Sequence, residues 1–197
     1  AHVAGTHLLD AATGTYNLPD VARHLKGMDV VVIHLAKRAQ GLMVAKGNPK
    51  GIAGLRDLVR RDVRFVNRQP GAGTRVLLDY RLAKLRIRPE RIDGYEREEF
   101  THMAVASAVA SGLADTGLGV RSAAQALGLD FLPVETEEFD LVLRRDFHDS
   151  AAGAALLAAV RSPELAAALA RFGGYDTEGA GAERPRTANP RAGKRRR

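Results

Sequence analysis

A short β-forming segment, a glycine-rich turn and a helical pattern follow one another directly and constrain this chain most. Residues 63–68 include Phe65 and Val66, which are β-formers, and Pro70-Gly71 ends the run. After Gly73 the larger apolar residues recur every three or four positions, at Val76, Leu77, Tyr80, Leu82 and Leu85. Such spacing is typical of an amphipathic helix. The segment is therefore predicted to run from a strand through a tight turn into a helix.

The turn has the composition of an oxyanion-binding site. A helix N-terminus offers unpaired N–H groups and the positive end of the helix dipole, so it attracts anions. Gly71 and Gly73 place no side chain in front of those donors. Arg68 and Arg75 add positive charge, and Thr74 adds a hydroxyl donor. The alternative interpretation is a purely structural turn in which Thr74 caps the helix, and both interpretations stay open on these residues alone.

Nucleotide-binding motifs match this turn less well than an oxyanion site does. A P-loop contains a glycine followed by lysine and then serine or threonine, and this turn has no lysine. A dinucleotide fingerprint needs a third glycine three residues after the second, but that position is Val76. An oxyanion is therefore the preferred ligand class.

Predicted strands and helices alternate along most of the chain, which indicates an α/β protein with mostly parallel sheet. The main predicted strands are 30–35, 41–45, 63–66, 131–134 and 139–143. The main predicted helices are 52–61, 74–85, 101–111, 122–127, 151–160 and 163–172. No apolar run approaches the roughly 20 residues that span a bilayer. Ligands of α/β folds bind at loops after the carboxyl ends of strands, which is the position of the turn from Arg68 to Thr74.

Charge is distributed unevenly along the chain. Residues 183–197 hold seven basic residues and one acid, so they supply +6 of the net charge of +7 and leave the body nearly neutral. This Gly/Ala/Pro/Arg segment lacks large apolar side chains, and residues 180–197 are predicted to be a disordered basic tail. Such a tail is able to make weak contacts with nucleic acid without sequence choice. Cysteine is absent, which excludes disulfides and thiolate metal sites.

Two further pairs of residues are candidate ligand contacts. Thr101 and His102 lie at a second predicted helix start, where the structural alternatives are a cap and a packing histidine. Thr6 and His7 follow an apolar segment at the front of the chain. The remaining histidines have no metal-ligand spacing, and no nucleophile–base pair stands out, so neither a metal site nor catalysis is predicted.

Many stretches resemble one family, the periplasmic-binding-protein-like domain of prokaryotic molybdate-related regulators and molybdopterin-biosynthesis fusion proteins. The resemblance runs from residue 1 to about 179. Its main stretches are Ala4-Gly5-Thr6-His7-Leu8-Leu9-Asp10, Arg38-Ala39-Gln40-Gly41-Leu42, residues 63–79, Glu99-Phe100-Thr101-His102, Val109-Ala110-Ser111-Gly112-Leu113-Ala114-Asp115 and Gly173-Gly174-Tyr175-Asp176. Arg68 and Thr74 also look like the anion-gripping pair of tungstate-binding transport proteins.

The resemblance implies a two-lobed type-2 α/β fold. Residues 1–40 and 140–179 would form the first lobe and residues 41–139 the second, with Arg38 and Gln40 at the hinge. Family members carry additional sequence before the position of Ala1, so the first lobe is expected to be incomplete here. With the candidates from the residues themselves, the predicted ligand set is Arg68, Gly73, Thr74, Arg75, Thr101, His102, Thr6 and His7.

The function implied is that of a non-catalytic, cytoplasmic sensor domain for molybdate or tungstate, with no cofactor. Closure of the two lobes would pass ligand occupancy to a fused or partner helix-turn-helix module. The alternative is an accessory anion-binding domain of a molybdopterin-biosynthesis transferase. A nucleic-acid-binding protein that acts through the basic tail is a third and weaker hypothesis.

Overall fold

The computed structural model describes residues 1–185, which form two compact units. The first unit contains Ala1–Ala36, Glu138–Leu165 and residues 177–185, and the second contains Lys37–Glu137 and Ala166–Asp176. Two long strands, β4 (Val30–Val44) and β8 (Asp130–Arg144), contribute residues to both units. The chain therefore passes between the units four times, twice within these strands and again after Leu165 and after Asp176.

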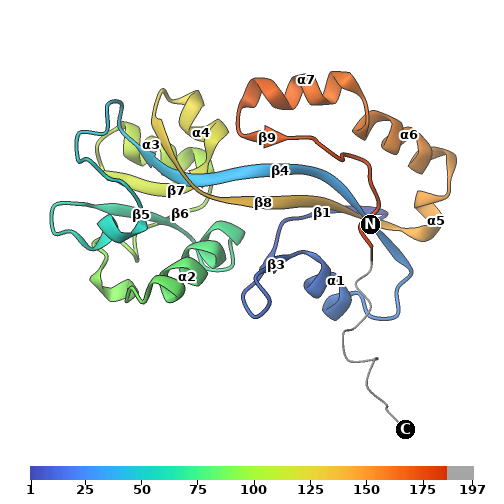
Figure 1. The fold of residues 1–197 in the computed structure, drawn as a ribbon, viewed down its shortest axis with the longest axis horizontal. Coiled ribbons are helices and arrows are strands. Elements are labelled where there is room, and N and C mark those ends of the chain that lie inside the picture. The colour runs from blue at the N-terminus through green and yellow to red at the C-terminus, as the bar shows by residue number, and fades with distance from the viewer. Residues whose placement is uncertain (186–197) are drawn as a thin grey trace, which may run out of the picture. The chain divides into compact units, whose positions relative to one another are not determined.

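In the first unit, β1 (Val3–Thr6) pairs antiparallel with β8, and β8 neighbours β4. Successive side chains of a strand point to opposite faces, and this segment of β4 is apolar on both. Val31 and Ile33 pack with Leu157 of α6 (Ala151–Val160), whereas Val30 and Val32 pack with residues of α1 (Leu18–His24). The first half of β4 is thus buried between two helices, which Figure 1 shows on either side of it.

Short elements complete the first unit. The strands β2 (Leu9–Asp10) and β3 (Thr15–Tyr16) form a hairpin, and α5 (Arg145–His148) follows β8. Asn17, at the start of α1, has a φ of 65° and is fully buried. Its side chain accepts a bond from the Leu8 N–H and donates to Asp140, with donor–acceptor distances of 2.8 Å in both cases. Asn17 therefore ties the N-terminal segment to β8.

In the second unit, β7 (Thr116–Val120) pairs antiparallel with β4 and parallel with β5 (Phe65–Arg68), and β5 pairs parallel with β6 (Glu98–Glu99). Figure 1 shows α2 (Gly73–Leu85) on one side of these strands and α3 (His102–Ala110) on the other. Fully buried apolar residues on the α2 side include Phe65, Leu77 and Leu78. The remaining elements of this unit are η1 (Leu55–Val59), η2 (Pro89–Arg91), α4 (Arg121–Ala126) and β9 (Tyr175–Asp176).

The predicted α/β class is confirmed, but the expectation of mostly parallel sheet is wrong. Parallel pairing joins β5 to β6 and to β7, whereas β1 pairs with β8, and β4 pairs with β7 and β9, in the antiparallel sense. The reason is that the strands predicted at 30–35 and 41–45 are one strand, β4, and those predicted at 131–134 and 139–143 are one strand, β8. Polar residues in the middle of each strand interrupted the apolar pattern.

The predicted division into lobes gave all of 140–179 to the first lobe, but most of the helix α7 (Pro163–Phe172) and all of β9 lie in the second unit. Ala166–Asp176 belongs to the second unit. Its backbone explains this, because β9 pairs with Lys37 and Arg38 of β4 and the Ala39 N–H donates to the Gly174 carbonyl at 2.7 Å.

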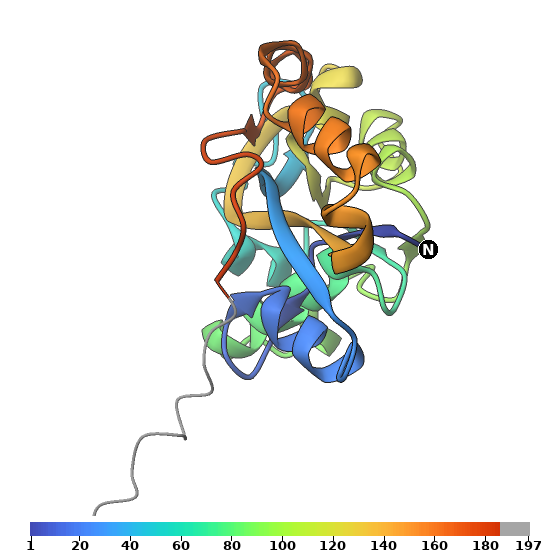
Figure 2. The same cartoon turned by 90° about the vertical axis from the view of Figure 1, so that its right-hand side faces the viewer.

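The predicted disorder of residues 180–197 is wrong for residues 180–185. Gly181, Ala182 and Arg184 exchange backbone hydrogen bonds with Val32 and His34 of β4, at distances of 2.7–2.8 Å. This segment, dark red in Figures 1 and 2, lies alongside β4 in both views. Backbone pairing and the ion pairs of Arg184 hold it without large apolar side chains. Residues 186–197, on which the predicted nucleic-acid contact rests, lie outside the described residues.

The helices of residues 1–185 are short. None of them is by itself long and apolar enough to cross a membrane. The successive helices α6 and α7 reach that length and composition only together, and the chain bends by 50° between them.

Candidate anion-binding site

The candidate site is built around the turn between β5 and α2 in the second unit. The strand ends at Arg68, Ala72 is the N-cap residue, and the helix begins at Gly73. The carbonyl of Ala72 accepts bonds from the Arg75 and Val76 N–H groups, at 2.9 and 3.0 Å. The N–H groups of Gly73 and Thr74 have no hydrogen-bond acceptor among residues 1–185. The turn therefore keeps two backbone donors available at the positive end of a 13-residue helix.

The glycine of this turn leaves space in front of the helix. Gly71 has a φ of +83°, and an added Cβ there would meet no heavy atom within 4 Å. A positive φ favours glycine because other residues are strained in that conformation. The glycine thus allows a sharp turn and also keeps bulk away from the helix N-terminus.

The Thr74 side chain belongs to a buried polar network, in which it accepts a hydrogen bond. Its side chain is almost fully buried, and its Oγ1 accepts a hydrogen bond from Gln40 Nε2 at 3.0 Å. Because this oxygen already acts as acceptor, the hydroxyl hydrogen is free to donate elsewhere. Thr74 is the second helical residue, since Ala72 is the N-cap, so the alternative prediction that Thr74 caps the helix is wrong.

The network continues from Gln40 into a buried ion pair. The same Gln40 Nε2 donates to Glu137 at 3.0 Å, and Glu137 pairs with Arg38 of β4. Gln40 is 0% exposed and Glu137 is 1% exposed. Arg38 and Gln40 were predicted only to assist at the hinge, and Glu137 was not predicted at all. Together these three side chains fix the position of Thr74.

Arg68 is a partly buried cation that faces neutral partners only. Its guanidinium donates to the carbonyls of Glu99 and Phe100, at 3.2 and 3.0 Å, and to the side-chain oxygen of Gln69 at 3.1 Å. Among residues 1–185, no carboxylate lies within ion-pair distance of it. Burial, together with the nearby charge of Arg38, lowers the pKa of Arg68 below its ordinary value. The folded protein therefore holds an arginine whose charge lacks a counter-ion.

Arg75 lies beside the turn, and neighbouring carboxylates already pair with its charge. Its guanidinium stacks over the Tyr95 ring at 4.0 Å and pairs with Asp79 and Glu98, both at 3.4 Å. It also donates to the carbonyl of Arg68 at 3.1 Å. The structure thus gives Arg75 the role of supporting the strand end that carries Arg68.

Thr101 and His102 lie next to Arg68, because the two carbonyls that accept from Arg68 immediately precede them. Thr101 is the N-cap of α3, and its side chain accepts a bond from the Ala104 N–H at 3.0 Å. His102 is the first residue of that helix, and its Nδ1 is buried close to Gly119 of β7. Thr101 therefore has the capping role that the sequence offered as its structural alternative.

Thr6 and His7 belong to the first unit and are engaged there. The Thr6 hydroxyl donates to Asn17 at 3.2 Å, and the His7 ring stacks on Phe139 with centroids 5.4 Å apart. Of the eight predicted ligand residues, the second unit contains Arg68, Gly73, Thr74, Arg75, Thr101 and His102, and the first unit contains Thr6 and His7. Hydrogen bonds link Arg75 to the Arg68 carbonyl and the Arg68 guanidinium to the two residues before Thr101.

Comparison with known proteins shows which family the chain belongs to. Residues 1–161 match the PBP superfamily domain, the class of periplasmic-binding-protein-like ligand-binding domains. The chain belongs to this superfamily. One relative is the uncharacterized protein YvgK of Bacillus subtilis (strain 168), which is 41% identical over 180 residues. The match covers 89% of this chain and 56% of YvgK, so the chain spans little more than half the length of that relative.

Two solved PBP-like structures show the same fold. The substrate-binding domain of a candidate molybdenum ABC transporter from Clostridium difficile has a TM-score of 0.56 and 16% identity, and the match covers 80% of this chain and 72% of that chain. The effector-binding domain of QuiR in complex with shikimate has a TM-score of 0.51 and 20% identity, with coverage of 64% and 61%. The two-lobed α/β fold predicted from the sequence is thereby confirmed, as is a ligand-binding PBP-like domain.

Proposed function

We propose that this PBP-like domain binds a small oxyanion reversibly at the turn between β5 and α2, without catalysing a reaction. The observation that supports this most is Arg68, a half-buried guanidinium with no carboxylate partner among the described residues. Placing a charge away from water is unfavourable unless it is paired. A bound anion would supply the missing counter-ion, and the two-donor face of a guanidinium suits an oxyanion.

The other donors of the turn complete a binding site around Arg68. The free N–H groups of Gly73 and Thr74 and the Thr74 hydroxyl add three neutral donors at the positive end of α2. Such a set suits a tetrahedral dianion, and we propose molybdate or tungstate. The Clostridium difficile neighbour, described as part of a molybdenum transporter, supports this choice.

We also propose that binding is coupled to transcription regulation through a fused or partner helix-turn-helix module. The QuiR neighbour, an effector-binding domain, supports a sensor role, and the chain covers only 56% of YvgK, which leaves length for another module in that relative. The alternative is an accessory anion-binding domain of a molybdopterin-biosynthesis transferase. A helix-turn-helix segment encoded in the same reading frame would favour the first, and a transferase domain would favour the second.

Arg68→Gln is expected to weaken oxyanion binding by roughly 10- to 100-fold, because a hydrogen bond to a charged group contributes about 1.5–3 kcal/mol. Isothermal titration calorimetry with molybdate, tungstate, sulfate and phosphate measures this for the wild type and the variant. Arg88→Gln is the matched control, since Arg88 is an exposed arginine of the same unit and has no ion pair within residues 1–185. It should bind like the wild type.

Two results would contradict the proposal. One is saturable oxyanion binding with equal affinity in the wild type and in Arg68→Gln, with both proteins folded by circular dichroism. The other is the absence of any heat of binding for all four anions in the folded wild type.

A further inference from the structure

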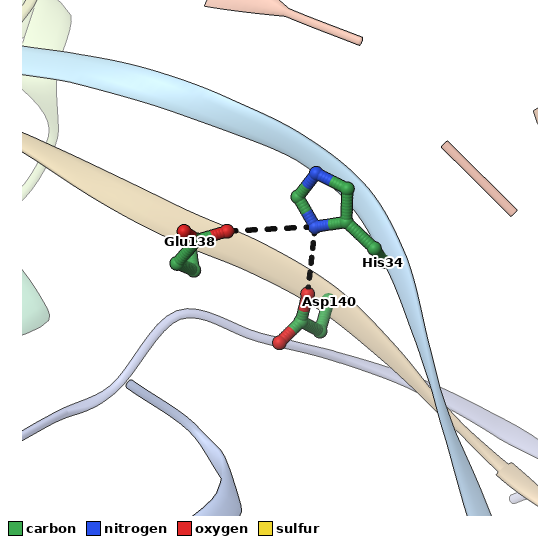
Figure 3. A group of neighbouring side chains, drawn as sticks. All are labelled: His34, Glu138 and Asp140. Carbon is green, nitrogen blue, oxygen red and sulfur yellow. Dashed lines mark hydrogen bonds and ion pairs between the residues drawn. The ribbon is translucent and has the colours of Figure 1, made fainter. Parts of the chain in front are cut away.

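A second polar cluster lies in the first unit and shares no residue with the proposed anion site. It consists of His34 on β4 and Glu138 and Asp140 on β8. Glu138 and Asp140 are two positions apart, so both project from the same face of their strand. Figure 3 shows the His34 ring turned with its Nδ1 atom toward both carboxylates. The pairing of β4 with β8 thus assembles three potential metal ligands from residues about a hundred positions apart.

The distances within this cluster match those of a tetrahedral metal centre. His34 Nδ1 lies 3.1 Å from Asp140 Oδ1 and 3.5 Å from Glu138 Oε2, and one ligand atom from each residue lies within 4.8 Å of the others. Zinc and similar ions bind nitrogen and oxygen at about 2.0–2.2 Å, so tetrahedral ligand atoms are about 3.4 Å apart. An imidazole with two carboxylates is also a donor set that divalent transition metals accept.

Within residues 1–185, the buried imidazole of His34 makes its polar contacts only with the two carboxylates of the cluster. The His34 side chain is 8% exposed, and its other nitrogen, Nε2, is buried with no hydrogen-bond partner within residues 1–185. Every polar contact of the ring is therefore directed at the two carboxylates. Asp140 is fully buried, and Asn17 occupies its second oxygen at 2.8 Å, which leaves Oδ1 directed toward His34.

A guanidinium supplies the positive charge of this cluster. Arg184 lies 2.6 Å from Glu138 Oε2 and 3.1 Å from Asp140 Oδ1, the same two oxygens that face His34. It comes from the C-terminal segment that pairs with β4, and its side chain is 27% exposed. Two carboxylates with one arginine leave a net charge of −1 when His34 is neutral. A divalent ion in place of the arginine would neutralise both carboxylates.

We infer that His34, Glu138 and Asp140 form a binding site for a divalent transition-metal ion, in competition with Arg184. The metal takes the position between the imidazole and the two carboxylates, and the guanidinium moves out with its exposed side chain. Metal binding then removes the side-chain anchor that holds residues 181–184 on β4. This site goes beyond the proposed oxyanion function and depends on none of its residues.

Cobalt(II) is the probe, because its visible absorption reports nitrogen and oxygen ligands at a tetrahedral site. The full chain is titrated with Co²⁺ as wild type, His34→Asn, Glu138→Gln and Arg184→Gln. Saturable absorption is expected for the wild type. We expect its loss, or at least about a tenfold weaker affinity, in His34→Asn and Glu138→Gln. Arg184→Gln removes the competing cation, so it should bind Co²⁺ about tenfold tighter than the wild type.

His24→Asn is the matched control, since His24 is an exposed histidine near Asp20 in the same unit and should not affect Co²⁺ binding. Glu138 is partly exposed, so Glu138→Gln keeps the test valid if His34→Asn fails to fold. The inference is overturned if neither the wild type nor Arg184→Gln binds Co²⁺ saturably. It is also overturned if Glu138→Gln binds as well as the wild type, or if Arg184→Gln binds more weakly than the wild type.

Discussion

Glu137→Gln is expected to lower the free energy of unfolding by about 3–5 kcal/mol, the usual cost of removing one partner of a buried ion pair. Glu137 is 1% exposed and Arg38 has a side-chain exposure of 12%, so neither charge is well solvated. Glutamine keeps the size and the hydrogen-bonding shape of glutamate but removes the negative charge that faces the Arg38 guanidinium. Chemical denaturation in urea, compared with the wild type, measures the loss.

Glu135→Gln is the matched control for this prediction. Glu135 lies on the same face of β8, two residues earlier, and pairs with Arg81 at 3.1 Å. Both partners are about one-third exposed, so the pair should contribute only about 0–1 kcal/mol. Similar losses in the two variants would mean that the Arg38–Glu137 pair has no special role in stability.

Gly94→Ala is expected to lower the free energy of unfolding by about 4 kcal/mol or more, because it combines backbone strain with a backbone clash. Gly94 has a φ of +89°, and an added Cβ would overlap the carbonyl of Phe65 in β5. The Phe65 carbonyl is a backbone group and cannot rotate away like the end of a flexible side chain, so the strand or the turn would have to move. Since β5 ends at Arg68, such a movement would displace the candidate site as well.

Gly71→Ala separates strain from clash in this comparison. Gly71 has a similar φ of +83° but open space around the added Cβ, so only about 1–2 kcal/mol of strain is expected. Thermal unfolding followed by circular dichroism compares both variants with the wild type. An effect of Gly94→Ala no larger than that of Gly71→Ala would refute the clash with Phe65.

The local features of the candidate anion site could be predicted from the sequence. Phe65 and Val66, the glycines and the helical spacing after Gly73 are short-range signals, and they gave the strand, the turn and α2 correctly. Chemistry alone also suggested Arg68 as a ligand, since a guanidinium beside a helix N-terminus suits an anion, and this role stays a prediction. The sequence could not show whether Arg75 faces the anion or its neighbours, because its partners Tyr95 and Glu98 are 20 and 23 residues away.

The features that failed depend on contacts between distant residues. The polar residues in the middle of β4 and β8 looked like breaks, but Arg38 and Glu137 pair across 99 positions and allow both strands to continue. The same limitation hid the His34 cluster, because the spacing of His34 to Asp140 is 106 residues and matches no local ligand motif. Glu138 and Asp140 lie two positions apart on β8, and only the pairing of β8 with β4 places them beside His34.

The most direct test of the anion site is an anomalous-scattering map of crystals grown with tungstate, because tungsten identifies the position of the bound anion independently of the chemistry around it. We predict one dominant peak in the second unit, with ligand oxygens within hydrogen-bond distance of the Arg68 guanidinium and of the Gly73 and Thr74 N–H groups. A dominant peak at other arginines, or no peak at Arg68 under saturating tungstate, would contradict the account.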